Sequence, residues 1–104
     1  MYNQDEILAK IKSVVLEEIP DAKVYLFGSR VTGNVHEESD WDILVITKII
    51  ADRALRKKMH YKLFPLNLTI NGFIETTIVN ENDWMTNPSY YVLRHSIRNE
   101  QLAL

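Results

Sequence analysis

The sequence contains no cysteine. Disulfide bonds, thiolate metal ligands and a thiol nucleophile are therefore excluded. No apolar run approaches the roughly 20 residues that span a bilayer, so we expect no membrane segment. The first ten residues are acidic and amphipathic rather than basic and then apolar, so we expect no signal peptide there. Together these absences predict a cytoplasmic protein without a membrane partner.

A strong charge of one sign is also missing. The 12 basic and 14 acidic residues give a formal net charge of −2 and a pI near 5.9. This balance provides no overall attraction to nucleic acid, which stays open as a partner but is not indicated. The histidines are far apart in the sequence and lack ligand spacing, so a zinc site is not expected. They are His36, His60 and His95.

The 104 residues are 46% hydrophobic and 25% charged, which is typical of an ordinary globular domain. We expect one domain over residues 1–104. Residues 23–27, 40–47 and 73–79 are β-branched or continuously apolar and predict strands. Helices are predicted from the capping pair Asn3 and Glu6 to Pro20, over about 49–64 up to Pro65, and from Asn87 onward, fraying towards Leu104. The resulting order predicts a small α/β (α+β) domain, a mixed sheet of about three or more strands flanked by helices.

Two carboxylates stand at the head of the second predicted strand. Asp40 and Asp42 are two residues apart, so in a strand they project from the same face, with Trp41 on the reverse side. Two carboxylates this close repel each other unless a cation lies between them, and their oxygens suit Mg²⁺. The alternative is that both residues solvate the strand end and bind loop amides.

A Gly-Ser pair ends the first predicted strand. Gly28 allows the backbone to approach a ligand closely, and Ser29 adds a hydroxyl in front of a short helical turn. Most Gly-Ser pairs are ordinary turns. A phosphate-binding turn after one strand and a carboxylate pair on the next is, however, the equipment for handling a nucleoside triphosphate.

These residues resemble the signature of the polymerase-β nucleotidyltransferase superfamily. They run from Gly28-Ser29-Arg30 through Gly33 to Ser39-Asp40-Trp41-Asp42-Ile43-Leu44-Val45. The size and order of elements are similar to the minimal nucleotidyltransferases (the MNT group). The resemblance implies the polymerase-β-like fold, with ATP as the nucleotide and Mg²⁺ or Mn²⁺ as the metal. It also implies transfer of AMP to a hydroxyl acceptor.

The resemblance also implies a role for particular residues. Asp40 and Asp42 would hold the metal, while Gly28, Ser29 and Arg30 would bind the nucleotide. The family's third carboxylate, a metal ligand and candidate base, is usually Asp and falls here on Glu75; Asp52 and Asp83 are weaker candidates. Arg30 has an alternative role, in which it pairs with Glu37 or Glu38.

Three hypotheses remain open from the sequence. The first is an active nucleotidyltransferase that acts with a HEPN-type helical partner, which the resemblance implies as in a toxin–antitoxin module. The second is a catalytically weak, antitoxin-like binding partner of such a protein on the same fold. The third is an unrelated α/β domain with a coincidental motif. Glu75 is the residue that separates the first two.

Overall fold

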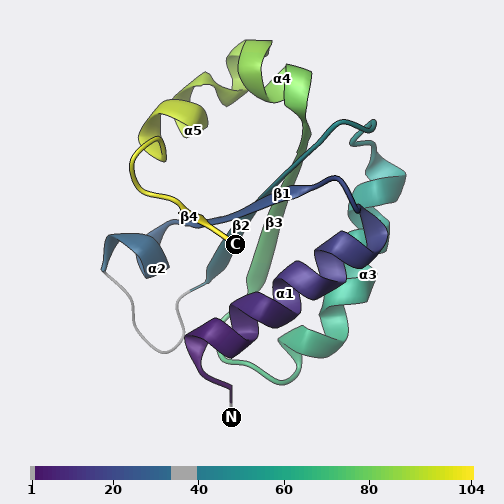
Figure 1. Ribbon diagram of the computed structural model, residues 1–104, viewed down its shortest axis with the longest axis vertical. Coiled ribbons are helices and arrows are strands. Elements are labelled where there is room, and N and C mark those ends of the chain that lie inside the picture. The colour runs from purple at the N-terminus through teal and green to yellow at the C-terminus, as the bar shows by residue number, and fades with distance from the viewer. Residues whose placement is uncertain (1, 34–39) are drawn as a thin grey trace.

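The computed structural model describes residues 2–33 and 40–104 (Figure 1). Its helices and strands follow the chain in the order α1 (Gln4–Glu18), β1 (Lys23–Phe27), α2 (Ser29–Thr32), β2 (Trp41–Thr47), α3 (Arg53–Asn67), β3 (Ile74–Asn80), α4 (Glu81–Thr86), the 3-10 helix η1 (Pro88–Tyr90), α5 (Tyr91–Ser96) and β4 (Leu102–Ala103). The predicted class, a mixed sheet flanked by helices, is confirmed.

The described strands form a four-stranded sheet in the order β3-β2-β1-β4. β1 pairs with β2 in antiparallel register, and β2 pairs with β3 in parallel register. The parallel pair needs a crossover, which α3 supplies. β2 is the central strand, and five of its seven residues are buried. This burial on both faces fits the continuous apolar run of the sequence.

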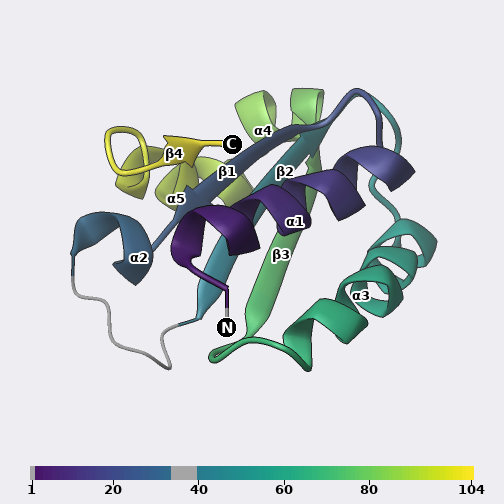
Figure 2. The ribbon, with the colours of Figure 1, turned by 60° about the horizontal axis from the view of Figure 1, so that its bottom comes forward.

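Helices α1 and α3 cover one face of the sheet side by side (Figure 2). A capping box starts α1, because the Asn3 side chain accepts a hydrogen bond of 2.9 Å from the Glu6 amide and the Glu6 side chain accepts one from the Asn3 amide. Its buried stripe and the inward residues of the strands make the main core. Fully buried members are Ile11, Val15, Ile19, Leu26, Ile43, Val45 and Met59.

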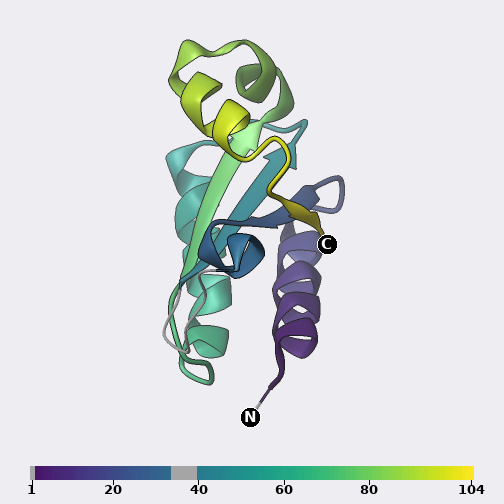
Figure 3. The same cartoon turned by 90° about the vertical axis from the view of Figure 1, so that its left-hand side faces the viewer.

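The other face of the sheet is covered at one end only. A second, smaller core joins Leu44 and Val79 of the sheet to Trp84 of α4 and to Ile97 after α5. Figure 3 shows α4 and α5 at the top end, where β2 and β3 finish. The beginnings of β2 and β3, which carry the acidic residues, lie at the opposite end of these strands.

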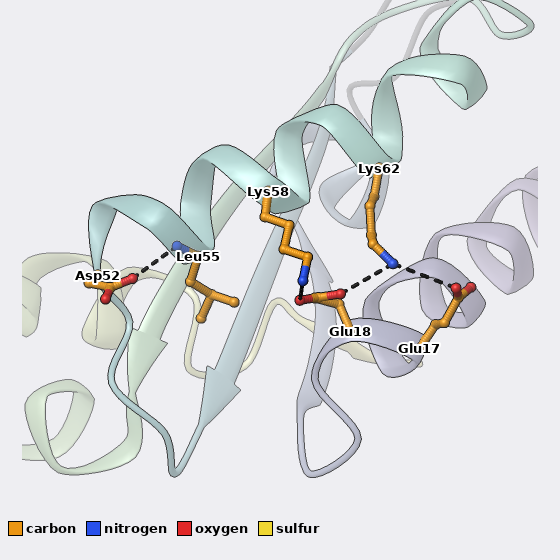
Figure 4. Close-up of polar contacts among 6 residues, drawn as sticks. All are labelled: Glu17, Glu18, Asp52, Leu55, Lys58 and Lys62. Atoms are coloured by element: carbon orange, nitrogen blue, oxygen red, sulfur yellow. Dashed lines mark hydrogen bonds and ion pairs between the residues drawn. The ribbon is translucent and has the colours of Figure 1, made fainter.

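Helix α3 differs from its prediction at both ends. It begins later than residue 49, because the Asp52 carboxylate accepts a hydrogen bond of 2.9 Å from the Leu55 amide and caps the helix there (Figure 4). It also continues through Pro65 to Asn67. The Leu68 amide donates to the Phe64 carbonyl at 3.3 Å, so the turn closes around the proline. The Asn67 side chain then accepts a hydrogen bond from the Ile74 amide, which holds this last turn.

Ion pairs connect the outer sides of α1 and α3. Lys58 contacts Glu18 at 2.8 Å, and Lys62 contacts Glu18 at 3.2 Å and Glu17 at 3.5 Å (Figure 4). Hydrogen bonds from Lys58 and Lys62 lower the pKa of Glu18. These two lysines therefore join α3 to α1.

The end of the chain also corrects a prediction. The final helix ends at Ser96, and Leu102 and Ala103 then pair with Leu26 and Tyr25 as the antiparallel strand β4. The Leu104 amide extends this pairing by donating to the Val24 carbonyl at 2.9 Å. Fraying towards Leu104 was thus the wrong expectation, since the open edge of β1 offers backbone partners to the tail. In the described residues no helix is long and apolar enough to cross a membrane.

The carboxylate of Asp21 fixes the loop after α1 to the end of β2. It accepts hydrogen bonds from the Thr47 hydroxyl at 2.8 Å and from the Lys48 amide at 2.7 Å. The Lys48 amide and then the Thr47 hydroxyl lower the pKa of Asp21, because both bond the charged form. A lowered pKa in the folded state means stability that is complete above the unfolded value and is lost as the pH falls.

We predict that Asp21→Asn lowers the free energy of unfolding by about 1 kcal/mol at pH 7, since it weakens two bonds to a charged acceptor. The difference from wild type should shrink as the pH falls below about 4, the usual range of an aspartate. Urea unfolding at several pH values measures it. The exposed Glu100→Gln is the control, and a pH-independent difference for Asp21→Asn would contradict the prediction.

Candidate functional site

One row of the sheet brings two acidic side chains together. Asp42 of β2 is the register partner of Phe27 on β1 and of Glu75 on β3. Register partners project to the same face, and adjacent strands are about 4.8 Å apart. The Asp42 and Glu75 side chains are therefore neighbours on the face away from α1 and α3, although 33 residues separate them in the sequence.

Asp40 lies at the edge of this pair. It precedes β2, which begins at Trp41, so the prediction that Asp40 is part of the strand is off by one residue. Asp40 is exposed, while Asp42 is half-buried. Burial raises the pKa of Asp42, and the negative charges of Glu75 and then Asp40 raise it further. The charges of Glu75 and Asp40 thus both act on Asp42.

The three carboxylates do not close around a common point. Across residues 2–33 and 40–104, no three histidine, aspartate or glutamate side chains are close enough together to hold a metal ion. Asp40 and Glu75 are both exposed, so their side chains have room to reorient. The assignment of all three as metal ligands stays a prediction.

The predicted phosphate-binding turn lies against Asp42. Gly28 has a φ of +79°, and a Cβ at this position would meet the Asp42 carboxylate, with its Cγ 3.1 Å away. Only glycine allows both this conformation and this approach. The Gly28 carbonyl accepts hydrogen bonds from the Val31 and Thr32 amides at 3.0 and 3.2 Å and so starts α2. The two halves of the sequence motif therefore meet in space.

Ser29 is the first residue of this single helical turn. The N–H groups in the first turn of a helix have no acceptor within that helix and point outward from its N-terminal end. Since Gly28 contacts Asp42, the start of α2 and the acidic row lie together. The short helical turn predicted after the Gly-Ser pair is confirmed, and Ser29 itself is its first residue.

Arg30 takes up a position that the sequence did not indicate. Its guanidinium lies over the Trp41 ring, 3.6 Å from the centroid. Trp41 is only 2% exposed, and its indole N–H donates to the Asn71 carbonyl at 3.1 Å, so Trp41 is a residue of the main core. Burial lowers the pKa of Arg30, and the charge of Asp40 opposes this effect.

Trp41 and Asp42 project to opposite faces of the sheet, because consecutive strand residues alternate. The contact with Trp41 therefore holds the Arg30 guanidinium towards the face opposite Asp42. Its role as a nucleotide ligand stays a prediction. Pairing with Glu37 or Glu38 lies outside the described residues.

The weaker acidic candidates have structural roles or positions away from the row. Asp52 caps α3, and Asp83 belongs to the first turn of α4. Trp84 is 8% exposed and belongs to the second core. Phe73, which the sequence interpretation did not single out, is 49% exposed and lies two residues before Glu75. The alternation of β3 was the signal that could have identified it.

We predict that Gly28→Ala disrupts this junction. The new Cβ would collide with the Asp42 carboxylate and hold a residue with a side chain at positive φ, at a cost of about 1–3 kcal/mol. Gly33→Ala is the matched control, because Gly33 has a φ of +91° but no described heavy atom within 4 Å of the added Cβ. Chemical denaturation compares the two variants; an equal loss of stability would contradict the Asp42 contact.

Comparisons with known proteins agree with this geometry. The family model described as a nucleotidyltransferase domain matches residues 8–81. Over 56 residues the chain is 34% identical to the probable protein adenylyltransferase MntA of Haemophilus influenzae, a match that covers 54% of this chain and 49% of that protein. The chain thus spans about half the length of this relative.

Two solved structures share the fold. A toxin–antitoxin structure with AMP-PNP has 25% identity and a TM-score of 0.64, with 91% of this chain and 69% of the other covered. An MNT antitoxin in complex with a tri-AMPylated HEPN toxin from Shewanella oneidensis has 22% identity and a TM-score of 0.63, with 97% and 71% covered. The resemblance to minimal nucleotidyltransferases is confirmed. Because the family match contains both Gly28 and the acidic row, the chain belongs to the nucleotidyltransferase domain family.

Proposed function

We propose that this domain transfers AMP from ATP to a hydroxyl group of a HEPN-type helical partner protein. The observation that carries the proposal is the junction of Gly28 with Asp42 in the same row as Glu75. Further support comes from the relatives: one is named a probable protein adenylyltransferase, and one is an MNT antitoxin in complex with an AMPylated HEPN toxin.

The acidic residues suit a divalent metal by their chemistry. Carboxylate oxygens are the donors that Mg²⁺ takes, together with substrate phosphates. The pKa of Asp42 is raised partly by its two acidic neighbours, and a cation between them would relieve this repulsion. Asp40, Asp42 and Glu75 would hold Mg²⁺, or Mn²⁺ in its place. When bound, the ion would neutralise charge on the triphosphate and lower the pKa of the acceptor hydroxyl.

The residues of the chain then divide the work. The amides of Gly28 and Ser29 and the Ser29 hydroxyl would bind the terminal phosphates, with Arg30 as a further candidate. Glu75 would accept the proton of the acceptor hydroxyl. The acceptor oxygen forms a bond to the α-phosphorus, and the bond from this phosphorus to pyrophosphate breaks, with pyrophosphate as the leaving group. Holding both reactants in line is the main contribution of the protein.

One feature favours a second candidate function. The family's third carboxylate is usually an aspartate, and the longer Glu75 places its oxygens differently. The domain could thus serve as a catalytically weak binding partner that covers the HEPN-type protein. This alternative requires a stable complex but no AMP transfer.

We predict that Asp40→Asn/Asp42→Asn weakens Mg²⁺-dependent ATP binding by about tenfold or more, on the scale seen when metal-site interactions are lost. Isothermal titration calorimetry measures it, with and without Mg²⁺. Asp83→Asn, an exposed aspartate on α4, is the control and should bind as wild type does. Equal affinity in the double variant and wild type would contradict the metal assignment.

We predict that Glu75→Gln lowers the rate of AMP transfer by about 10²- to 10⁴-fold, the usual contribution of a general base. Glu75→Asp should keep measurable activity, because it retains a carboxylate. The acceptor in this assay is a HEPN-type protein co-purified with this chain, and mass spectrometry detects the added AMP. A stable complex without AMP in wild type would support the binding-only function, whereas neither complex nor AMP would contradict both.

A further inference from the structure

We propose that Phe73 is an acceptor-binding residue, whose ring contacts the part of the partner protein next to the reacting hydroxyl. This inference rests on the proposed function and assigns the acceptor side of the site.

The backbone places Phe73 on the acidic face of the sheet. The Trp41 amide donates to the Phe73 carbonyl at 2.8 Å, so the pairing of β3 with β2 already holds at this residue. The next residue, Ile74, is 4% exposed and belongs to the core under α1 and α3. Because strand side chains alternate, Phe73 projects to the opposite face, as Glu75 does.

The ring of Phe73 is not used to build the described cores. It is 49% exposed, and neither core cluster includes it. A large aromatic side chain left half-exposed beside charged groups suits contact with another molecule, since it offers a broad apolar face with little conformational entropy to lose. Its position beside Asp40 in the extended register brings that face to the border of the acidic row.

The order of strands decides which substrate meets Phe73. Gly28 and Ser29 follow β1, on one side of Asp42, whereas Phe73 directly precedes β3 and Glu75 belongs to it, on the other side. In phosphoryl and nucleotidyl transfer the attacking and leaving oxygens lie roughly in line, on opposite sides of the phosphorus. With the terminal phosphates at Gly28 and Ser29, the acceptor therefore approaches along β3. β3 is also an edge strand of the sheet, so the acceptor reaches the acidic row from that edge.

The test compares two phenylalanines of equal exposure. Phe64 on α3 is also 49% exposed but belongs to the helix that packs under the opposite face. With the co-purified partner protein as acceptor, we expect Phe73→Ala to raise the KM for the partner by about tenfold, as for a central aromatic contact. The Kd for Mg²⁺–ATP should stay within about twofold of wild type, since uniform loss on the acceptor side leaves nucleotide binding intact. Phe64→Ala should change neither constant.

Two further variants separate contact from folding. Phe73→Trp should restore the KM, because it keeps an aromatic face, and Phe73→Leu tests the position with a residue of conserved bulk. Thermal melting of each variant identifies any loss of structure. If Phe73→Ala has the same KM for the partner as Phe64→Ala, the inference is overturned and the proposed function still stands. Where the alanine variant does not fold, the KM of Phe73→Leu is compared with that of Phe64→Ala instead, with the same consequence. A weakened Mg²⁺–ATP affinity in Phe73→Ala would overturn it too, whereas absence of AMP transfer in wild type would overturn both.

Discussion

Repulsion between like charges on adjacent strands is the constraint on which this structure depends. Asp42 and Glu75 are register partners, and like charges opposite each other destabilise a sheet. Burial raises the pKa of Asp42, and the negative charge of Glu75 raises it further, as expected for such a pair. The pair is held in place because the rest of β2 is anchored: Ile43, Leu44 and Val45 have no exposed surface. A buried strand has one strongly favoured register, because a shift would move its apolar side chains out of the core. The register therefore fixes Asp42 beside Glu75.

The same register couples the acidic row to the glycine turn. Phe27 is opposite Asp42, and Gly28 is the next residue, so the antiparallel pairing of β1 and β2 brings Gly28 to the carboxylate. A side chain at this position would collide with Asp42. The glycine is thus needed for the backbone to reach the carboxylate, in addition to any contact with a phosphate. The glycine turn and the acidic residues, which are the two halves of the motif, therefore form a single site in the folded chain.

Much of this arrangement could be predicted from the sequence, and the exceptions have physical reasons. Strand β1 and helix α1 follow from strong periodicity and a capping box, and the site follows from a motif with two coupled parts. The late start of α3 and its passage through Pro65 depend on hydrogen bonds that the Asp52 and Asn67 side chains accept, and hydrophobic periodicity does not reveal these bonds. Strand β4 has two residues, too few for a pattern, and exists because β1 has an open edge.

The site itself shows the same division. Glu75 could be aligned with the family pattern, but its position beside Asp42 depends on parallel pairing across a helix crossover, which only the fold provides. The stacking of Arg30 on Trp41 depends on a tertiary contact between α2 and the start of β2. From the sequence, Arg30 was expected to bind either a phosphate or a loop glutamate. Neither expectation involves Trp41, a buried ring 11 residues further along the chain.

The unequal cover of the two sheet faces explains why such a small domain needs a partner for the proposed chemistry. One face is covered by α1 and α3, while the C-terminal helices cover only the far end of the other. The acidic row therefore remains at an open end of the sheet, where Glu75 and half of the Phe73 side chain face solvent. Nucleotidyl transfer requires that water be kept from the reacting phosphorus and that the acceptor be held in line. Within residues 2–33 and 40–104 no helix covers this row, so in the proposed function the molecule that carries the acceptor would close the site.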